Sequence, residues 1–232
     1  MEGSKATMKR LDRLICERGG YSRKQASLLV RKKRVTSNGI LLLQGAQRYP
    51  EDIPIEIDSE VLKVLPTVIA FHKPEGVLSA NSDFEGRPCV GDWLPPRFHI
   101  VGRLDSDTRG LLLFSRDGAL TQRMLHPKFG TEREYIATVK GNPKPELISQ
   151  LAVGVSTSLG LAQARVLDLG EDWVRLVVTE GRNRIVRRML HNAGHSVLEL
   201  ERVRFGTITI GDLAEGASRN VTTEELRMWQ MK

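Results

Sequence analysis

The sequence has little cysteine and no long apolar run, and each of these shortages excludes a class of protein. Its 232 residues include two cysteines, Cys16 and Cys89, which form no CxxC pair. Neither a disulfide framework nor a cysteine-based zinc site is therefore indicated, which fits a reducing compartment. No apolar run approaches the ~20 residues of a membrane-spanning helix. The segment from Met1 to Arg10 also holds no apolar core of a secretory signal peptide.

These shortages limit the cellular compartments and the cofactors that we expect for the protein. We expect a cytoplasmic protein, or an organellar one whose transit peptide has been removed, with no membrane partner. The sequence contains no Gly-rich phosphate loop and no Ser-His-Asp arrangement with supporting motifs. We therefore predict no nucleotide cofactor. The length suffices for a sizeable core and for one or two domains.

Positive charge is concentrated at the start of the chain. Residues 1–50 carry twelve Lys/Arg and three Asp/Glu, a net charge of +9, whereas the remaining 182 residues carry 23 basic and 25 acidic groups. Such asymmetry indicates a separate module that binds a polyanion. A membrane-surface segment is the alternative, but residues 8–34 contain no Trp or Phe to anchor one. Nucleic acid is the favoured partner.

The basic segment has the pattern of two helices followed by a hairpin. Leu11, Leu14 and Ile15 have helical spacing, which predicts a helix over residues 8–18. Ser22 and Gln25 form a capping-box signature for a second helix that ends near residue 32. The sequence Ser-Asn-Gly at 37–39 predicts a tight turn between two strands, and alternation over residues 51–60 predicts the last strand of this domain. The basic side chains of the second helix and its end are candidates for RNA binding: Arg23, Lys24, Arg31, Lys32, Lys33 and Arg34.

A cluster of charged residues precedes an apolar run near the middle of the chain. Two aspartates and two arginines occur between Arg103 and Arg109, and Leu-Leu-Leu-Phe at 111–114 predicts a buried strand. A charged loop attached to a core strand can hold a carboxylate in place and control its solvation. A salt-bridged surface turn is the alternative. Asp105-x-Asp107 could also indicate Mg²⁺, but arginines flank the pair and no third carboxylate lies nearby in sequence.

The rest of the chain after residue 67 has recognisable elements. We predict strands at 68–71, 132–139, 164–168 and 173–179, a loop at 83–96, helices beginning at Asp117 and spanning 184–192, and a C-terminal helix from Thr222 or Thr223. On the helix at 184–192, Arg184, Arg187 and Arg188 share a basic face. Such a face is usually solvated or bound to phosphate, and we take Arg184 and Arg188 as RNA-binding candidates.

Several motifs together resemble one enzyme family. Gly102-Arg103-Leu104-Asp105 with Asp107-Thr108-x-Gly-Leu-Leu-Leu is similar to the catalytic segment of RsuA/RluB-type pseudouridine synthases. Lys73-Pro74-Glu75-Gly76, the segment 180–190 and the segment 198–206 are similar to other motifs of that family, in family order. The basic N-terminal segment resembles the S4 RNA-binding domain. The resemblance covers nearly the entire chain, from about Met8 to Trp229.

The resemblance implies roles for particular residues. Asp105 corresponds to the family's nucleophile, Tyr135 to a tyrosine that packs against the target base, and Leu200 to an apolar active-site residue. Arg187 corresponds to the arginine or lysine that forms an ion pair with the nucleophile. Arg103 corresponds to a residue that occupies the space vacated by the extruded base. Ile185 stands where relatives usually carry Gln or Glu.

The expected protein is α+β. A small α/β S4-like RNA-binding domain (8–62) and a linker (63–67) precede a synthase domain (68–232) with a mixed, largely antiparallel sheet. Its expected reaction is the isomerisation of a uridine in ribosomal RNA, with the large subunit weakly favoured, on naked RNA or an assembly intermediate. We expect no cofactor and no metal, and a monomer. The alternatives are a non-catalytic RNA-binding or ribosome-assembly factor of the same fold and, more weakly, a metal-dependent nuclease.

Overall fold

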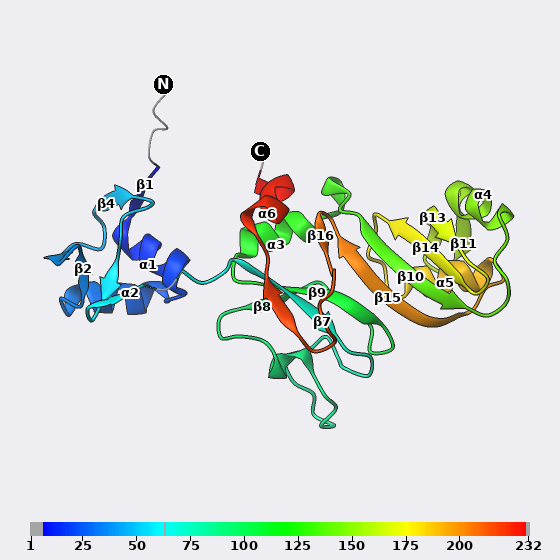
Figure 1. Ribbon diagram of the computed structural model, residues 1–232, viewed down its shortest axis with the longest axis horizontal. Coiled ribbons are helices and arrows are strands. Elements are labelled where there is room, and N and C mark those ends of the chain that lie inside the picture. Colours follow the sequence, from blue (N-terminus) through cyan, green and yellow to red (C-terminus); the bar gives the residue numbers. More distant parts are fainter. Residues whose placement is uncertain (1–6, 63, 231–232) are drawn as a thin grey trace, which may run out of the picture. The chain divides into compact units, whose positions relative to one another are not determined.

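The chain divides into two compact units, Met1–Pro66 and Thr67–Lys232. The computed structural model describes residues 7–62 and 64–230 (Figure 1). None of the helices in these two ranges has the length and apolar content that crossing a membrane requires. Each unit has a hydrophobic core of its own.

The N-terminal unit packs two helices on short strands. Helices α1 (Leu11–Gly19) and α2 (Arg23–Arg31) bury Leu11, Leu14 and Leu29 in the core. The strands are β1 (Met8–Arg10), which pairs with β4 (Arg48–Pro50), and a sheet in the order β3 (Ile40–Leu41), β2 (Val35–Ser37), β5 (Glu56–Ile57), β6 (Glu60–Val61).

Local sequence signals decide most of this unit. The capping box of Ser22 and Gln25 is present, and Asn38 and Gly39 have φ of 48° and 76°, as the tight turn requires. The prediction that the first helix begins at Met8 is wrong, because residues 8–10 pair with β4. The single strand predicted over 51–60 is also wrong. There the chain forms β5 and β6, joined by a turn at Asp58 and Ser59.

The C-terminal unit is built on a nine-stranded sheet. Its strand order is β13 (Arg165–Leu169), β14 (Trp173–Val178), β10 (Arg133–Val139), β15 (Val197–Phe205), β9 (Arg109–Ser115), β7 (Val68–Lys73), β17 (Ser218–Asn220), with β8 (His99–Val101) on β9 and β16 (Ile208–Thr209) on β15. Only β9 and β15 pair in parallel. The predicted α+β class with a mixed, largely antiparallel sheet is confirmed.

Helices cover both faces of this sheet, which explains the continuous apolar run at 111–114. Leu112 and Phe114 enter a core with α4 (Glu146–Val153) and α5 (Ile185–Asn192). Leu111 and Leu113 enter a second core with α3 (Gly118–Leu125) and α6 (Thr223–Gln230). Because successive side chains of a strand point to opposite faces, a strand covered on both sides is apolar throughout. Figure 1 shows α4 and α5 at the β13 end of the sheet, and α3 and α6 near β7 and β9.

Some elements had no predicted counterpart. Helix α4 and the hairpin of β11 (Val155–Thr157) and β12 (Gly160–Ala162) follow β10. The predicted loop at 83–96 includes a short 3₁₀ helix, η1 (Val90–Asp92), and a second, η2 (Pro127–Phe129), follows α3. Asp117 caps α3 as predicted, accepting hydrogen bonds from two backbone amides.

Candidate active site

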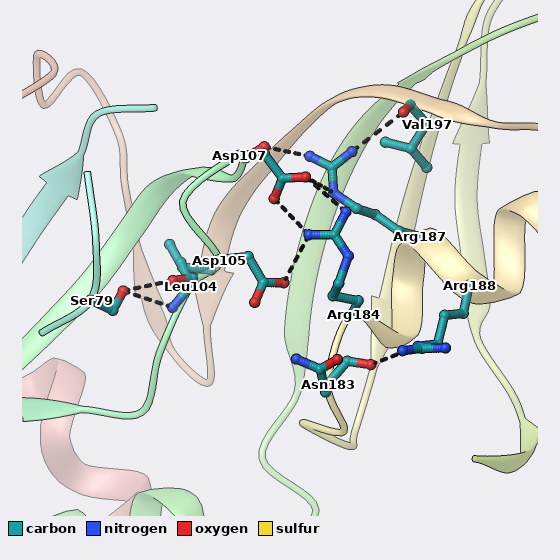
Figure 2. A network of polar contacts seen from close by, with 9 residues as sticks. All are labelled: Ser79, Leu104, Asp105, Asp107, Asn183, Arg184, Arg187, Arg188 and Val197. Carbon is teal, nitrogen blue, oxygen red and sulfur yellow. Dashed lines mark hydrogen bonds and ion pairs between the residues drawn. The ribbon is translucent and has the colours of Figure 1, made fainter. Parts of the chain in front are cut away.

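The loop between β8 and β9 carries Asp105 and is held by hydrogen bonds on both sides. The Ser79 hydroxyl donates to the Leu104 carbonyl at 2.7 Å and accepts from the Leu104 amide at 3.1 Å (Figure 2). The Gly76 amide donates to the Ser106 carbonyl at 2.8 Å, and the Thr108 amide donates to the Asp105 carbonyl at 3.1 Å. Asp105 is therefore presented from a loop fixed to the sheet, which suits a group that must hold its position.

A cavity of about 300 Å³ opens beside this loop. Three of the four predicted catalytic residues line it together: Asp105 from the loop, Tyr135 from β10 and Leu200 from β15. Tyr135 and Leu200 are both largely buried. A carboxylate facing a flat aromatic ring and an apolar wall can take a planar polar ligand between them, and the volume is within the range of small-molecule sites.

The cation nearest to Asp105 is not the predicted one. Arg184 lies 3.9 Å from the Asp105 carboxylate and donates to both carboxylate oxygens of Asp107, at 3.0 and 2.8 Å. The helix expected from about Arg184 to Asn192 is present as α5, Ile185–Asn192. Arg184 is its N-cap in the left-handed region, at φ 52°. Its side chain points toward the loop that carries Asp105 and Asp107 (Figure 2).

Arg187 contacts the loop but forms no ion pair with Asp105, so the prediction of that ion pair is wrong. One guanidinium nitrogen donates to the Asp107 carbonyl, a second donates to the Val197 carbonyl at 3.3 Å, and Nε lies 3.4 Å from the Asp107 carboxylate. Arg187 therefore connects the Asp105 loop to α5 and β15. Burial lowers its pKa, and the neighbouring Asp107 and Asp105 carboxylates counter that effect.

Burial and charged neighbours change the pKa values of groups around the loop. The Arg184 hydrogen bonds lower the pKa of Asp107, against an opposing effect of burial. Burial lowers the pKa of Lys73, the last residue of β7, to about 8, although the carboxylates of Glu75, Asp107 and Asp105 favour its charged form. Its ammonium donates to the carbonyls of Pro74 and Val77 at 2.7 and 2.8 Å. Lys73 thus stabilises the turn whose Gly76 amide donates a hydrogen bond to the Asp105 loop.

The predicted RNA-binding residues fall into three groups. Arg103 and Arg184 line the cavity, with Arg103 exposed. Arg188 lines a second hollow of about 460 Å³ along α5, which Arg184 and Arg187 line as well. The six predicted residues of the N-terminal unit are all exposed: Arg23, Lys24, Arg31, Lys32, Lys33 and Arg34. Of these, Arg34 forms an ion pair with Asp58.

Three buried polar residues that line the cavity were not predicted from the sequence. Arg133, Arg202 and Thr108 line the cavity and are 7%, 2% and 2% exposed. Strand alternation could have found two of them. Arg133 is two residues before Tyr135 and Arg202 is two residues after Leu200, so each shares a sheet face with a predicted catalytic residue. Arginine usually marks the surface, which conceals this signal.

The Asp105-x-Asp107 pair meets arginines. Within residues 7–62 and 64–230, no three His, Cys, Asp or Glu side chains lie together in a group that could hold a metal ion. The two carboxylates are instead neutralised by Arg184 and Arg187.

Comparison with known proteins identifies the family. Residues 67–192 match the model of the RNA pseudouridylate synthase family. The chain is 34% identical to ribosomal large subunit pseudouridine synthase B of Bacillus subtilis, over 95% of each chain. It is 37% identical to the protein of that name from Vibrio cholerae, over 86% of this chain and 67% of that one. A crystal structure of a pseudouridylate synthase superposes with a TM-score of 0.66 at 28% identity, covering 95% of this chain and 99% of that chain. The chain therefore belongs to the RNA pseudouridylate synthase family and is an RNA pseudouridine synthase of the RluB type, an isomerase.

Proposed function

We propose that the chain isomerises a uridine of large-subunit ribosomal RNA, with Asp105 as the nucleophile. The observation that carries the proposal is the meeting of Asp105, Tyr135 and Leu200 around one cavity. The names of the Bacillus and Vibrio relatives support the choice of RNA.

The target base must leave its stack to enter the cavity, at a cost of a few kcal/mol. Tyr135 stacks on the extruded base, and Leu200 excludes water from its other side. Arg103, exposed beside the cavity, takes the space that the base vacates. Contacts between cationic side chains and RNA phosphates offset the cost of extrusion.

Asp105 must be ionised to act. Burial opposes ionisation and a nearby guanidinium favours it. The Asp105 side chain is 34% exposed and has Arg184 at 3.9 Å, so both solvent and a cation stabilise the carboxylate. In this state it can attack C1′ or C6 of the nucleotide, or assist a glycal route.

The N-terminal unit supplies general RNA affinity. Its basic side chains gather on α2 and the segment after it, all of them exposed. These charges attract phosphates and carry no sequence information, so the choice of uridine depends on the catalytic unit and on RNA shape.

Tritium release from RNA labelled at C5 of uridine tests this function directly, because the C5 hydrogen leaves when C1′ bonds to C5. We expect release from a large-subunit transcript, not from a small-subunit transcript. Asp105→Asn should release none while binding RNA as tightly as the wild type. Ser106→Ala is the matched control, since the Ser106 carbonyl, not its side chain, accepts the Gly76 bond.

Two outcomes would contradict the proposal. Turnover by Asp105→Asn would remove the assigned nucleophile, and RNA binding without release by the wild type would indicate a non-catalytic binding factor. EDTA should leave the rate unchanged, whereas RNA cleavage that EDTA abolishes would indicate a nuclease.

A further inference from the structure

Two arginines inside the catalytic unit are buried without a carboxylate partner. Arg202 is 2% exposed and Arg133 is 7% exposed. Among the described residues, neither guanidinium has an Asp or Glu within ion-pair distance. Glu134, a buried carboxylate on β10, does have partners of opposite charge in Arg175 and Arg204. Burying a charge without a counter-charge is costly, so such a pair needs a reason.

The groups around the two guanidiniums satisfy them only in part. Arg202 donates from Nε to the Leu111 carbonyl at 2.8 Å, while its Nη2 is buried without a hydrogen-bond partner among the described residues. Arg133 donates to the carbonyls of Thr131 and Thr179. Both guanidiniums lie over the Phe205 ring, at 5.2 and 5.1 Å from its centre. The pKa of Arg133 is lowered by burial and by the charge of Arg202.

Both arginines line the catalytic cavity at the place where the base is expected. Tyr135 and Arg202 are direct partners in the pairing of β10 with β15, as are Ala137 and Leu200. Arg202 therefore stands opposite the ring that stacks on the base. Thr108, from the catalytic loop, adds a buried hydroxyl that also has no partner among the described residues. Unpaired donors around one cavity suit a ligand rich in acceptors.

We propose that Arg202, supported by Arg133, is a catalytic residue that stabilises the negative charge that develops on the uracil. This inference rests on the proposed function and deepens it. In the displacement route, Asp105 bonds to C1′ as the C1′–N1 bond breaks, and the electron pair moves onto the uracil, spread over N1, O2 and O4. After the base turns, C5 attacks C1′ with that pair and expels the carboxylate. The proton on C5 is then lost and N1 gains one. Attack at C6 and the glycal route also move electrons into the ring.

Charge that appears only as the bond breaks is the kind that an enzyme should meet with a fixed cation. Donors positioned where charge develops accelerate the step, because their interaction is stronger in the transition state than in the ground state. A backbone phosphate is charged throughout, so an arginine on a phosphate would strengthen binding and leave the bond-breaking step unchanged. The exposed basic side chains of the N-terminal unit suit that task, whereas Arg202 is buried and lines the cavity where the base is expected.

Single-turnover kinetics with two RNAs tests the assignment. One is the tritiated uridine transcript. The other carries 5-fluorouridine, whose ring fluorine makes the uracil anion more stable, and its consumption is followed by nuclease digestion and chromatography. We expect Arg202→Met to slow the uridine reaction about 100-fold, the range for loss of one charge-stabilising donor. On fluorouridine RNA the loss should be at least tenfold smaller, and RNA affinity should change less than twofold.

Two further variants separate this role from a structural one. Arg202→Lys keeps a cation and should recover part of the uridine rate. Arg204→Met removes the next arginine of the same strand, which pairs with Glu134 and Glu132, and should leave both rates unchanged. Tryptophan fluorescence confirms folding, and Arg202→Lys carries the test if the methionine variant unfolds.

Three results would overturn the inference. Equal losses on the two RNAs would make Arg202 structural. A weaker RNA affinity that accounts for the whole rate loss would assign it to a phosphate. Full activity in both Arg202 variants would leave it without a role. All three presuppose an active wild type; a wild type that converts no uridine would instead overturn the proposed function.

Discussion

Lys73 makes the stability of the catalytic unit depend on pH in a predictable direction. Its side chain is fully buried, and burial lowers its pKa from 10.5 to about 8. Below pH 8 both the folded and the unfolded chain hold the proton. Between pH 8 and 10.5 only the unfolded chain holds it, so unfolding takes up a proton and stability rises with pH. Each pKa unit is worth about 1.4 kcal/mol, which gives a rise of up to about 3 kcal/mol.

Urea unfolding of the wild type and of Lys73→Met measures this contribution. The three tryptophans, Trp93, Trp173 and Trp229, all belong to the catalytic unit, so their fluorescence reports that unit alone. The methionine variant also loses the hydrogen bonds to Pro74 and Val77, but that loss is the same at every pH. The difference between wild type and variant should therefore be flat below pH 8 and should rise toward pH 10.5.

The control is Lys140→Met, which removes an exposed lysine from the same unit. A wild-type curve parallel to that of Lys73→Met across this range would refute the reasoning. It would show that Lys73 keeps its proton in the folded chain and that burial has been offset by the nearby carboxylates.

Three further predictions follow from the site and the fold. Arg184→Gln should slow isomerisation no more than about fivefold, because half-exposed ion pairs are worth at most about 1 kcal/mol. Arg187→Gln should slow isomerisation more, because it releases the Asp105 loop from α5 and β15. Equal single-turnover rates of the two variants would contradict this prediction. Deleting residues 1–62 should weaken RNA binding. It should also reduce the slope of log K against the logarithm of salt concentration by about 0.7–0.9 for each RNA phosphate that these residues neutralise. An unchanged slope would exclude residues 1–62 from the RNA interface. Gly110→Ala should unfold or severely destabilise the catalytic unit, because Gly110 has φ 108° and a Cβ would lie 2.4 Å from the Arg202 carbonyl oxygen. Gly118 has open space around it, so Gly118→Ala should leave the midpoint of thermal unfolding nearly unchanged.

The sequence predicts the elements whose signals are local. The leucines at 111–113 indicate a buried strand whatever surrounds them. Ser22 and Asp117 each predict the start of a helix, and the structure contains the capping hydrogen bonds that their side chains accept from the backbone. Met8–Arg10 was mispredicted because its conformation depends on β4, some forty residues away. Pairing with a distant strand leaves little trace in a short segment.

The site could be predicted as a set of residues, not as a set of contacts. The family resemblance implied that Asp105, Tyr135 and Leu200 share one active site, and they do line one cavity. The resemblance implied Arg187 as the cation near Asp105, whereas the structure has Arg184 there at 3.9 Å, at an N-cap whose left-handed backbone the helical pattern does not predict. The buried Arg133 and Arg202 needed the strand register, since nothing in their immediate sequence says that they face a cavity.

Pseudouridine mapping of large-subunit ribosomal RNA, by carbodiimide modification and primer extension, tests the central claim most directly. RNA should be compared from cells that lack the gene, cells with the wild type and cells with Asp105→Asn at equal protein level. The account predicts a site that is lost with the gene and restored by the wild type but not by the variant. A map that stays unchanged without the gene, or a site restored by Asp105→Asn, would contradict it.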